Sequence, residues 1–119
     1  MAQQTDQYTI LICTKCRGTD VASRMRADLA ECVPSGFTFR AVDCMAGCDN
    51  PATVGFQATG KATYVFGDIE GDKDIAALAT FAHQYQQSET GWTSATERPV
   101  ALSTKTLARI PALKGTGPL

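Results

Sequence analysis

The sequence lacks any long apolar run and any recognisable targeting segment. No stretch approaches the roughly 20 apolar residues that a membrane-spanning helix requires. Residues 1–7 are polar, and they lack the basic start and the apolar centre of a secretory signal. We therefore expect a cytoplasmic protein with no membrane partner. In that reducing compartment, clustered cysteines bind metals or serve catalysis more often than they form disulfides.

The sequence also lacks an excess of charge of either sign. It has 11 basic and 12 acidic residues, which give a formal net charge of -1. This balance produces no general field that would attract nucleic acid or an anionic membrane surface. At 119 residues and 44% hydrophobic composition, the chain is sufficient for a single core. A protein or a small molecule is therefore the expected partner.

Motifs for hydrolysis or group transfer are missing as well. There is no G-x-S-x-G, no glycine-rich phosphate loop and no pair of carboxylates fixed on one element. The single histidine, His83, falls in a predicted helix, where a surface position is more usual than a ligand role. The acidic stretch 67–74 lacks the central glycine and the closing glutamate of a calcium loop, so we interpret it as helix capping. We expect a carrier and not an enzyme.

Cysteine, in contrast, is abundant and grouped. Four of the five cysteines form two close pairs, Cys13 with Cys16 and Cys44 with Cys48. Thiolates are soft ligands, and two such pairs in a short chain indicate a site for iron-sulfur or zinc. The fifth, Cys32, stands apart on a helical pattern, where we expect a buried and inert thiol.

The elements around the cysteines predict a βαβ unit. Residues 8–12 are an apolar, β-branched run typical of a buried strand, and residues 37–42 alternate like a second strand. Between them, Val21, Met25 and Leu29 recur at helical spacing after the capping residues Thr19 and Asp20. If the two strands are parallel, their carboxyl ends lie at the same edge of the sheet. Both cysteine pairs directly follow those ends, and ligands of open α/β sheets bind at that edge.

The remaining sequence predicts a hairpin, a closing helix and an arm. Two short runs, 53–57 and 62–66, flank the turn 59–61 and indicate an antiparallel hairpin. Residues 75–87 carry apolar side chains on one helical face. We therefore expect an α/β domain over residues 1–87 with a single mixed sheet. Residues 88–119 read as an extended C-terminal arm with one short helix within 100–110, and Trp92 would fasten this arm to the domain or to a partner subunit.

Three kinds of chemistry fit the cysteines. By count, four thiolates satisfy a 2Fe-2S cluster, two on each iron, and they equally satisfy a structural zinc ion. Spacing favours the cluster, because the second pair is C-x-x-x-C with Gly47 inside and Pro51 after it, whereas structural zinc usually joins two C-x-x-C pairs. Cys13 and Cys16 alone match a thioredoxin-type redox dithiol, which leaves Cys44 and Cys48 without a role.

This order of elements, with the segment Cys-Met-Ala-Gly-Cys-Asp-Asn-Pro after the second strand, resembles the thioredoxin-like 2Fe-2S ferredoxins. That family includes the small cluster-bearing subunit of NADH dehydrogenases and hydrogenases. The similarity covers about residues 8–87. The chain is also similar to a group of small bacterial proteins called predicted metal-binding proteins.

The resemblance implies a thioredoxin-like fold and a 2Fe-2S cluster held by Cys13, Cys16, Cys44 and Cys48. It also implies electron transfer to a redox partner protein, and it makes a homodimer plausible. One difference lies in the first pair, where two residues separate Cys13 from Cys16 and the family usually has four or more. A tight pair of this kind still chelates one iron in other ferredoxins.

Overall fold

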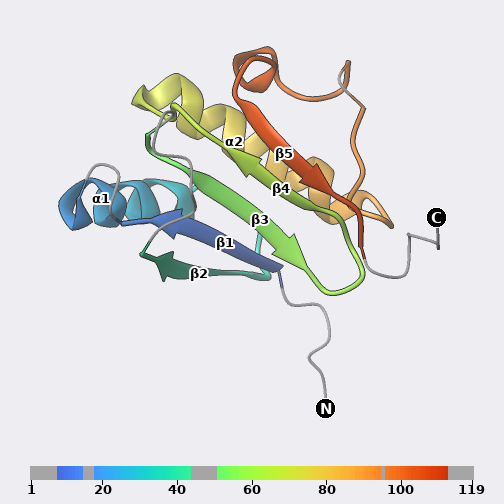
Figure 1. Ribbon diagram of the computed structural model, residues 1–119, viewed down its shortest axis with the longest axis horizontal. Helices are drawn as coiled ribbons and strands as arrows, with labels where there is room; N and C mark the ends of the chain where they lie inside the picture. Colours follow the sequence, from blue (N-terminus) through green and yellow to red (C-terminus); the bar gives the residue numbers. More distant parts are fainter. Residues whose placement is uncertain (1–7, 15–17, 44–50, 95, 113–119) are drawn as a thin grey trace.

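A computed structural model describes residues 8–14, 18–43, 51–94 and 96–112 of the chain. These residues form one five-stranded mixed sheet in the order β2-β1-β3-β4-β5, in which β1 and β2 are parallel and the other neighbours antiparallel (Figure 1). The elements in chain order are β1 Tyr8–Cys13, α1 Thr19–Ala30, β2 Phe37–Val42, β3 Val54–Ala58, β4 Thr63–Phe66, α2 Gly71–Gln87, the 3-10 helix η1 Val100–Leu102 and β5 Thr106–Ile110. The predicted α/β class and the thioredoxin-like arrangement of its βαβ unit, hairpin and closing helix are confirmed.

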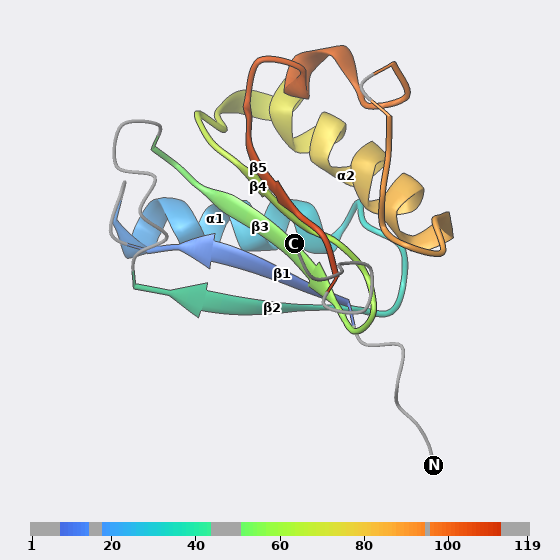
Figure 2. The same ribbon diagram turned by 45° about the vertical axis from the view of Figure 1, so that its right-hand side comes forward.

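The molecule has two layers. Both α-helices cover the same face of the sheet, and the views in Figures 1 and 2 agree on this arrangement. The core lies between the layers, where the aromatic side chains of Phe56, Tyr64, Phe66 and Phe81 are fully buried. Their rings pack mostly edge to face, for example Phe56 against Phe81 with centroids 4.9 Å apart. Among the described residues, no helix is both long and apolar enough to cross a bilayer.

Helix α1 differs from its prediction at both ends. It begins after Gly18, whose φ of 89° suits glycine, and no side chain caps it, so Thr19 is its first residue and not its cap. The buried stripe contains Ala22, Met25 and Leu29, while the predicted Val21 is 38% exposed. The helix ends at Ala30, and the N–H of Cys32 donates to the carbonyl of Leu29 in the turn that follows. The predicted burial of Cys32 is therefore wrong. Its side chain is exposed, because the helix ends at Ala30 and Cys32 lies in the turn that follows.

Helix α2 begins four residues earlier than expected, at Gly71. Asp74 in its first turn accepts a hydrogen bond from the backbone N–H of Glu70 at 2.9 Å, which satisfies one donor at the helix start. Asp74 thus acts at the helix start, whereas the side chain of the N-cap residue Glu70 forms no capping hydrogen bond. The predicted face is confirmed, since it is buried against the sheet along the whole helix: Ile75, Leu78, Ala79, Ala82 and Tyr85.

The C-terminal part of the chain extends the sheet beyond the predicted boundary at residue 87. Strand β5 pairs with β4, with Tyr64 opposite Arg109 and a register shift next to Phe66. Leu102, in η1, is fully buried in the common core. The expected short helix is the three-residue η1, whereas the strand was not predicted. The predicted role of Trp92 is different from what the structure shows, because its ring contacts Arg109 of the same segment, whose Cζ lies 3.6 Å from the ring centre.

Candidate functional site

The carboxyl ends of β1 and β2 lie side by side, which is the arrangement expected if the two strands are parallel. Cys13 is in register with Val42, and the backbone N–H of Thr14 donates to the carbonyl oxygen of Val42 at 2.9 Å. The same register runs along both strands, so their ends are held by the whole parallel pairing and not by one contact. We call this end of the sheet, from Cys13 and Thr14 across to Asp43, the cysteine edge.

Cys13 is the predicted ligand that the structure describes. It is the last residue of β1, its side chain is 3% exposed, and its N–H donates to the carbonyl of Thr53 at 3.0 Å. Its Sγ donates to the carbonyl oxygen of Asp43 at 3.7 Å, so the thiol is directed toward the residue that precedes Cys44 in sequence. This geometry is set by β2 and β3, which flank β1 on its two sides.

The other three predicted ligands, Cys16, Cys44 and Cys48, lie outside the described residues. In the part of the chain that is described, no three histidine, cysteine, aspartate or glutamate side chains are grouped to hold a metal ion. The residues that flank the undescribed segments do converge, however. Thr14 precedes residues 15–17 and Asp43 precedes residues 44–50, and both contact the same strand ends. After the second segment, Thr53 is fully buried and accepts the N–H of Cys13.

The donor chemistry of the cysteine edge fits an iron-sulfur cluster. A 2Fe-2S cluster needs four thiolates, and the chain has one thiol directed along this edge and three more within a few residues of it in sequence. His83 is exposed on α2, which confirms its predicted surface position. By ligand count the same four thiolates also fit zinc.

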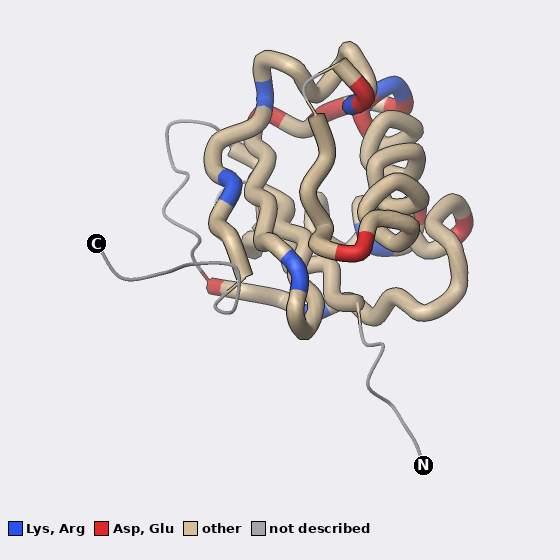
Figure 3. Tube along the Cα trace, turned by 90° about the vertical axis from the view of Figure 1, so that its right-hand side faces the viewer, with Lys and Arg blue, Asp and Glu red and all other residues tan. Residues whose placement is uncertain are grey.

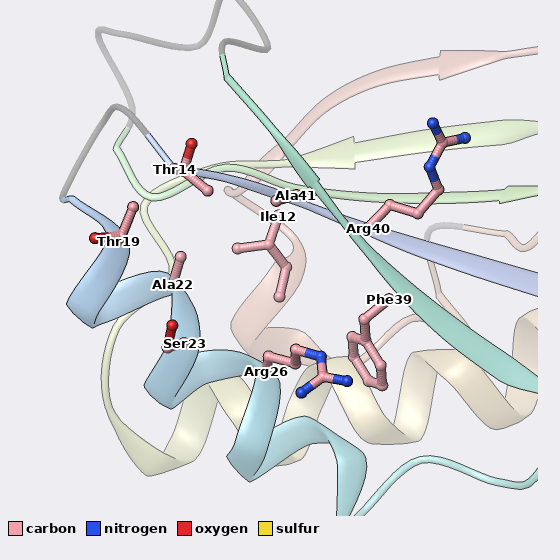
Figure 4. A pocket seen from close by; sticks show the side chains of 9 residues that line it. All are labelled: Ile12, Thr14, Thr19, Ala22, Ser23, Arg26, Phe39, Arg40 and Ala41. Atoms are coloured by element: carbon pink, nitrogen blue, oxygen red, sulfur yellow. The ribbon is translucent and has the colours of Figure 1, made fainter.

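A hollow of about 260 Å³ lies between α1 and β2, next to the cysteine edge (Figure 4). Its floor is apolar, and the guanidinium carbon of Arg26 lies 5.8 Å from the ring centre of Phe39 at one end. The other end lies beside Thr14 and Thr19, the described residues on either side of segment 15–17. The lining residues are Ile12, Thr14, Thr19, Ala22, Ser23, Arg26, Phe39, Arg40 and Ala41. A small apolar group seated there would lie next to Thr14 of the cysteine edge.

The arginines of α1 lie in two different hollows. Arg24 lines one between α1 and the start of α2, together with Asp28 and Glu70. Arg26 lines the hollow between α1 and β2, at the end away from Thr14 and Thr19. Helical spacing is the signal that indicates it, because Arg26 lies one turn after Ala22 and Ser23 on the face of α1 that borders β2.

The fold and the site define a small two-layer α/β protein with a buried cysteine, Cys13, at the carboxyl edge of its parallel strand pair. The chain belongs to the family described as protein of unknown function (DUF1636), which it matches over residues 10–112. A search among curated proteins found no match. A search among solved structures found none either. The family match extends from β1 through β5, and it therefore includes the C-terminal strand as well as the four cysteines.

Proposed function

We propose that this protein is an electron carrier of the 2Fe-2S ferredoxin type, with a cluster ligated by Cys13, Cys16, Cys44 and Cys48. The observation that carries the proposal is the contact between the Cys13 thiol and the carbonyl of Asp43 across the parallel strand pair. It relates the first cysteine pair to the beginning of the second, although 30 residues separate the two contacting groups.

Chain connectivity supports the same assignment. Consecutive Cα atoms are about 3.8 Å apart, and Cys44 directly follows Asp43 while Cys16 follows Thr14 by two positions. Thr14 and Asp43 both lie at the cysteine edge, where their backbone groups contact the ends of the parallel strands. The second segment rejoins the described chain at Pro51, just before the buried Ala52 and Thr53. Both ends of this segment are thus fixed near Cys13.

When bound, a 2Fe-2S cluster accepts and donates one electron without needing further catalytic groups. The chain would tune that exchange through burial and hydrogen bonding of the ligand sulfurs. Cys13 contributes burial, since its side chain is 3% exposed. Its Sγ donates to Asp43 as a protonated thiol, and ligation as a thiolate would end this donation. We further propose a cytoplasmic redox partner protein that binds at the cysteine edge. An apolar side chain of this partner would occupy the hollow between α1 and β2.

The deciding experiment is metal analysis of the anaerobically purified full-length protein. We expect about two iron and two sulfide per chain, a coloured sample, and an EPR signal after reduction by one electron. A colourless sample with one zinc per chain and no sulfide would replace the electron carrier with a zinc-binding module. Disulfide reductase activity that survives Cys44→Ser and Cys48→Ser but not Cys16→Ser would instead assign the chemistry to the first pair.

A further inference from the structure

Two arginines from the C-terminal part of the chain meet at one backbone carbonyl. Arg98 Nη1 donates to the carbonyl oxygen of Thr93 at 3.0 Å, and Arg109 Nη1 donates to the same oxygen at 3.4 Å. Thr93 is 2% exposed, and its N–H donates to the hydroxyl of Tyr64 at 2.9 Å. Two positive charges therefore converge on a buried, neutral acceptor.

No described carboxylate compensates these charges. Within residues 8–14, 18–43, 51–94 and 96–112, the ion pair that forms joins Lys105 to Asp74, and neither arginine takes part. Glu97 is adjacent to Arg98 in sequence, but its Oε1 accepts from the N–H and the hydroxyl of Ser94. In the same ranges, Arg98 Nε is buried and has no hydrogen-bond acceptor. An anion in contact with both guanidinium groups would therefore meet two positive charges that no described ion pair neutralises.

A hollow of about 420 Å³ adjoins both arginines. Its lining residues are Arg98, Ser103, Thr106, Leu107, Ala108 and Arg109, and we call it the arginine hollow. The hydroxyl protons of Ser103 and Thr106 are already donated to the carbonyls of Val100 and Leu102, so the guanidinium groups supply the available donors. Among the described residues, no acidic side chain lines it.

Packing holds these guanidinium groups in place before any ligand arrives. Cζ of Arg109 lies 3.6 Å from the ring centre of Trp92, and Cζ of Arg98 lies 5.6 Å from that of Tyr64. Stacking on aromatic rings orients a guanidinium fork at little cost in side-chain entropy on binding. Burial would raise the pKa of Tyr64, yet hydrogen bonds from Thr93 and the charge of Arg109 lower this pKa below its ordinary value of 10.0. This direction agrees with the contacts that Arg98 makes with the Tyr64 hydroxyl and that Arg109 makes with Thr93.

We propose that the arginine hollow binds a small dianionic oxyanion, either inorganic phosphate or the phosphate group of a monoester. Two uncompensated guanidinium groups match the charge of a phosphate dianion better than that of a single carboxylate, and their forked N–H groups match its oxygens. The cationic character is local, because the whole chain has a net charge of -1 and both signs occur at many places along it (Figure 3). Strand β5 is at the opposite edge of the sheet from β2, so this site is separate from the cysteine edge.

A titration of the full-length protein followed by NMR tests the proposal. The chain has one tryptophan, so the indole N–H signal of Trp92 reports directly on the group stacked against Arg109. Inorganic phosphate, glycerol phosphate and acetate are added separately at constant ionic strength. We expect saturable shifts with phosphate, and acetate binding weaker by about tenfold or more because it carries one charge fewer. Tighter binding of glycerol phosphate would assign the site to monoesters, and equal or weaker binding to the free ion.

Matched variants separate this site from general charge effects. Arg109→Gln and Arg98→Gln should each weaken phosphate binding by about tenfold or more. Arg40→Gln, on the opposite edge strand, should leave it unchanged. If Arg98→Gln does not fold, Arg109→Lys still provides a test, because it keeps the charge and loses the fork. Shifts that rise linearly without saturation, acetate binding as tight as phosphate binding, or an equal effect of Arg40→Gln would each overturn the proposal.

Discussion

The two edges of the sheet carry different chemistry, and they are built in different ways. At the cysteine edge, the reactive residues follow two neighbouring parallel strands within a few positions of each strand end. At the β5 edge, Tyr64, Thr93 and Arg109 come from three separate places in the sequence and meet through long-range contacts. The first kind of site follows from the spacing of residues after each strand and from the parallel pairing of β1 with β2. The second depends on how the C-terminal segment packs against the rest of the fold.

The largest expected effect tests the cysteine edge. If the cluster is ligated as proposed, Cys13→Ser and Cys44→Ser should each lose most of the bound iron and the visible absorption, because a cluster with three thiolates is incomplete. Cys32→Ser is the matched control, since Cys32 is exposed in the turn after α1. Iron and sulfide per chain are measured after anaerobic purification. Full iron in Cys13→Ser together with loss in Cys32→Ser would move the fourth ligand to Cys32.

The second prediction tests whether the β5 edge is an integral part of the core. Leu102 is fully buried, so Leu102→Ala should lower the free energy of unfolding by about 2–5 kcal/mol. Val100→Ala, two residues earlier in the same 3-10 helix, removes a side chain that is 87% exposed and should change it by less than about 0.5 kcal/mol. Urea unfolding measures both. Equal and small effects would show that residues 100–110 are a loosely attached arm.

The predictability of the two edges follows from this difference. The bounds of β2 and the hairpin could be predicted because alternation and a turn with Gly60 are local signals. The helix between β1 and β2 predicted a βαβ unit, and the structure fulfils the condition that its two strands are parallel. Given that pairing, the residues that follow the two strands are expected at one edge of the sheet. Cys13 is placed there, while the positions of Cys16, Cys44 and Cys48 stay a prediction.

The C-terminal strand had no comparable signal. Residues 106–110 place Arg109 among apolar residues, and Leu107 and Ile110 are 40% and 55% exposed, so neither alternation nor burial marks a strand in isolation. The pairing with β4 is supported by contacts that sequence spacing does not reveal. Lys105 contacts Asp74 across 31 positions, and Tyr64 contacts Thr93 across 29. Tertiary contacts of this kind override weak local propensity.

The third prediction concerns the polar contact that joins this segment to α2. Lys105 Nζ donates to Asp74 Oδ2 and to the carbonyl of Asp68, each at 2.6 Å, with side-chain exposures of 21% for Lys105 and 8% for Asp74. Lys105→Met keeps most of the side-chain volume and removes both bonds. We expect a loss of about 1–3 kcal/mol in the free energy of unfolding, because hydrogen bonds to charged groups in partly buried positions are worth that much.

Lys73→Met is the control for this loss, because Lys73 is exposed on the first turn of α2 and forms no ion pair within the described part of the chain. It should change the free energy of unfolding by less than about 0.5 kcal/mol. Both variants are compared by urea unfolding at neutral pH. A Lys105→Met protein as stable as Lys73→Met would mean that the segment is held by Leu102 and the strand pairing alone.

The smallest effect distinguishes two buried tyrosines by their response to alkaline pH. Burial raises the pKa of Tyr85 well above its ordinary value of 10.0, and the charges of Tyr8 and Tyr64 act in the same direction. The folded protein therefore keeps the Tyr85 proton when the unfolded chain loses it, so this contribution to stability is present below pH 10.0 and is lost as the pH rises further. Tyr85→Phe should flatten the alkaline decline. At neutral pH it should cost about 1 kcal/mol, because it removes the hydrogen bond to the carbonyl of Ala62.

Tyr64→Phe should change the alkaline decline in stability in the opposite direction, because Thr93 and Arg109 of the β5 edge lie next to Tyr64. Its pKa is lowered by Thr93 and Arg109 despite burial, so its contribution is present above pH 10.0 and is lost as the pH falls through the lowered pKa. Tyr64→Phe removes that gain and should make the alkaline decline steeper than in the unaltered protein. The free energy of unfolding of both variants is measured between about pH 8 and 11, where phenol ionisation dominates the difference between them. If both variants changed the slope of the free energy of unfolding against pH in the same direction, the arginines would not impose a positive potential on Tyr64. The electrostatic difference between Tyr64 and Tyr85 would then be absent.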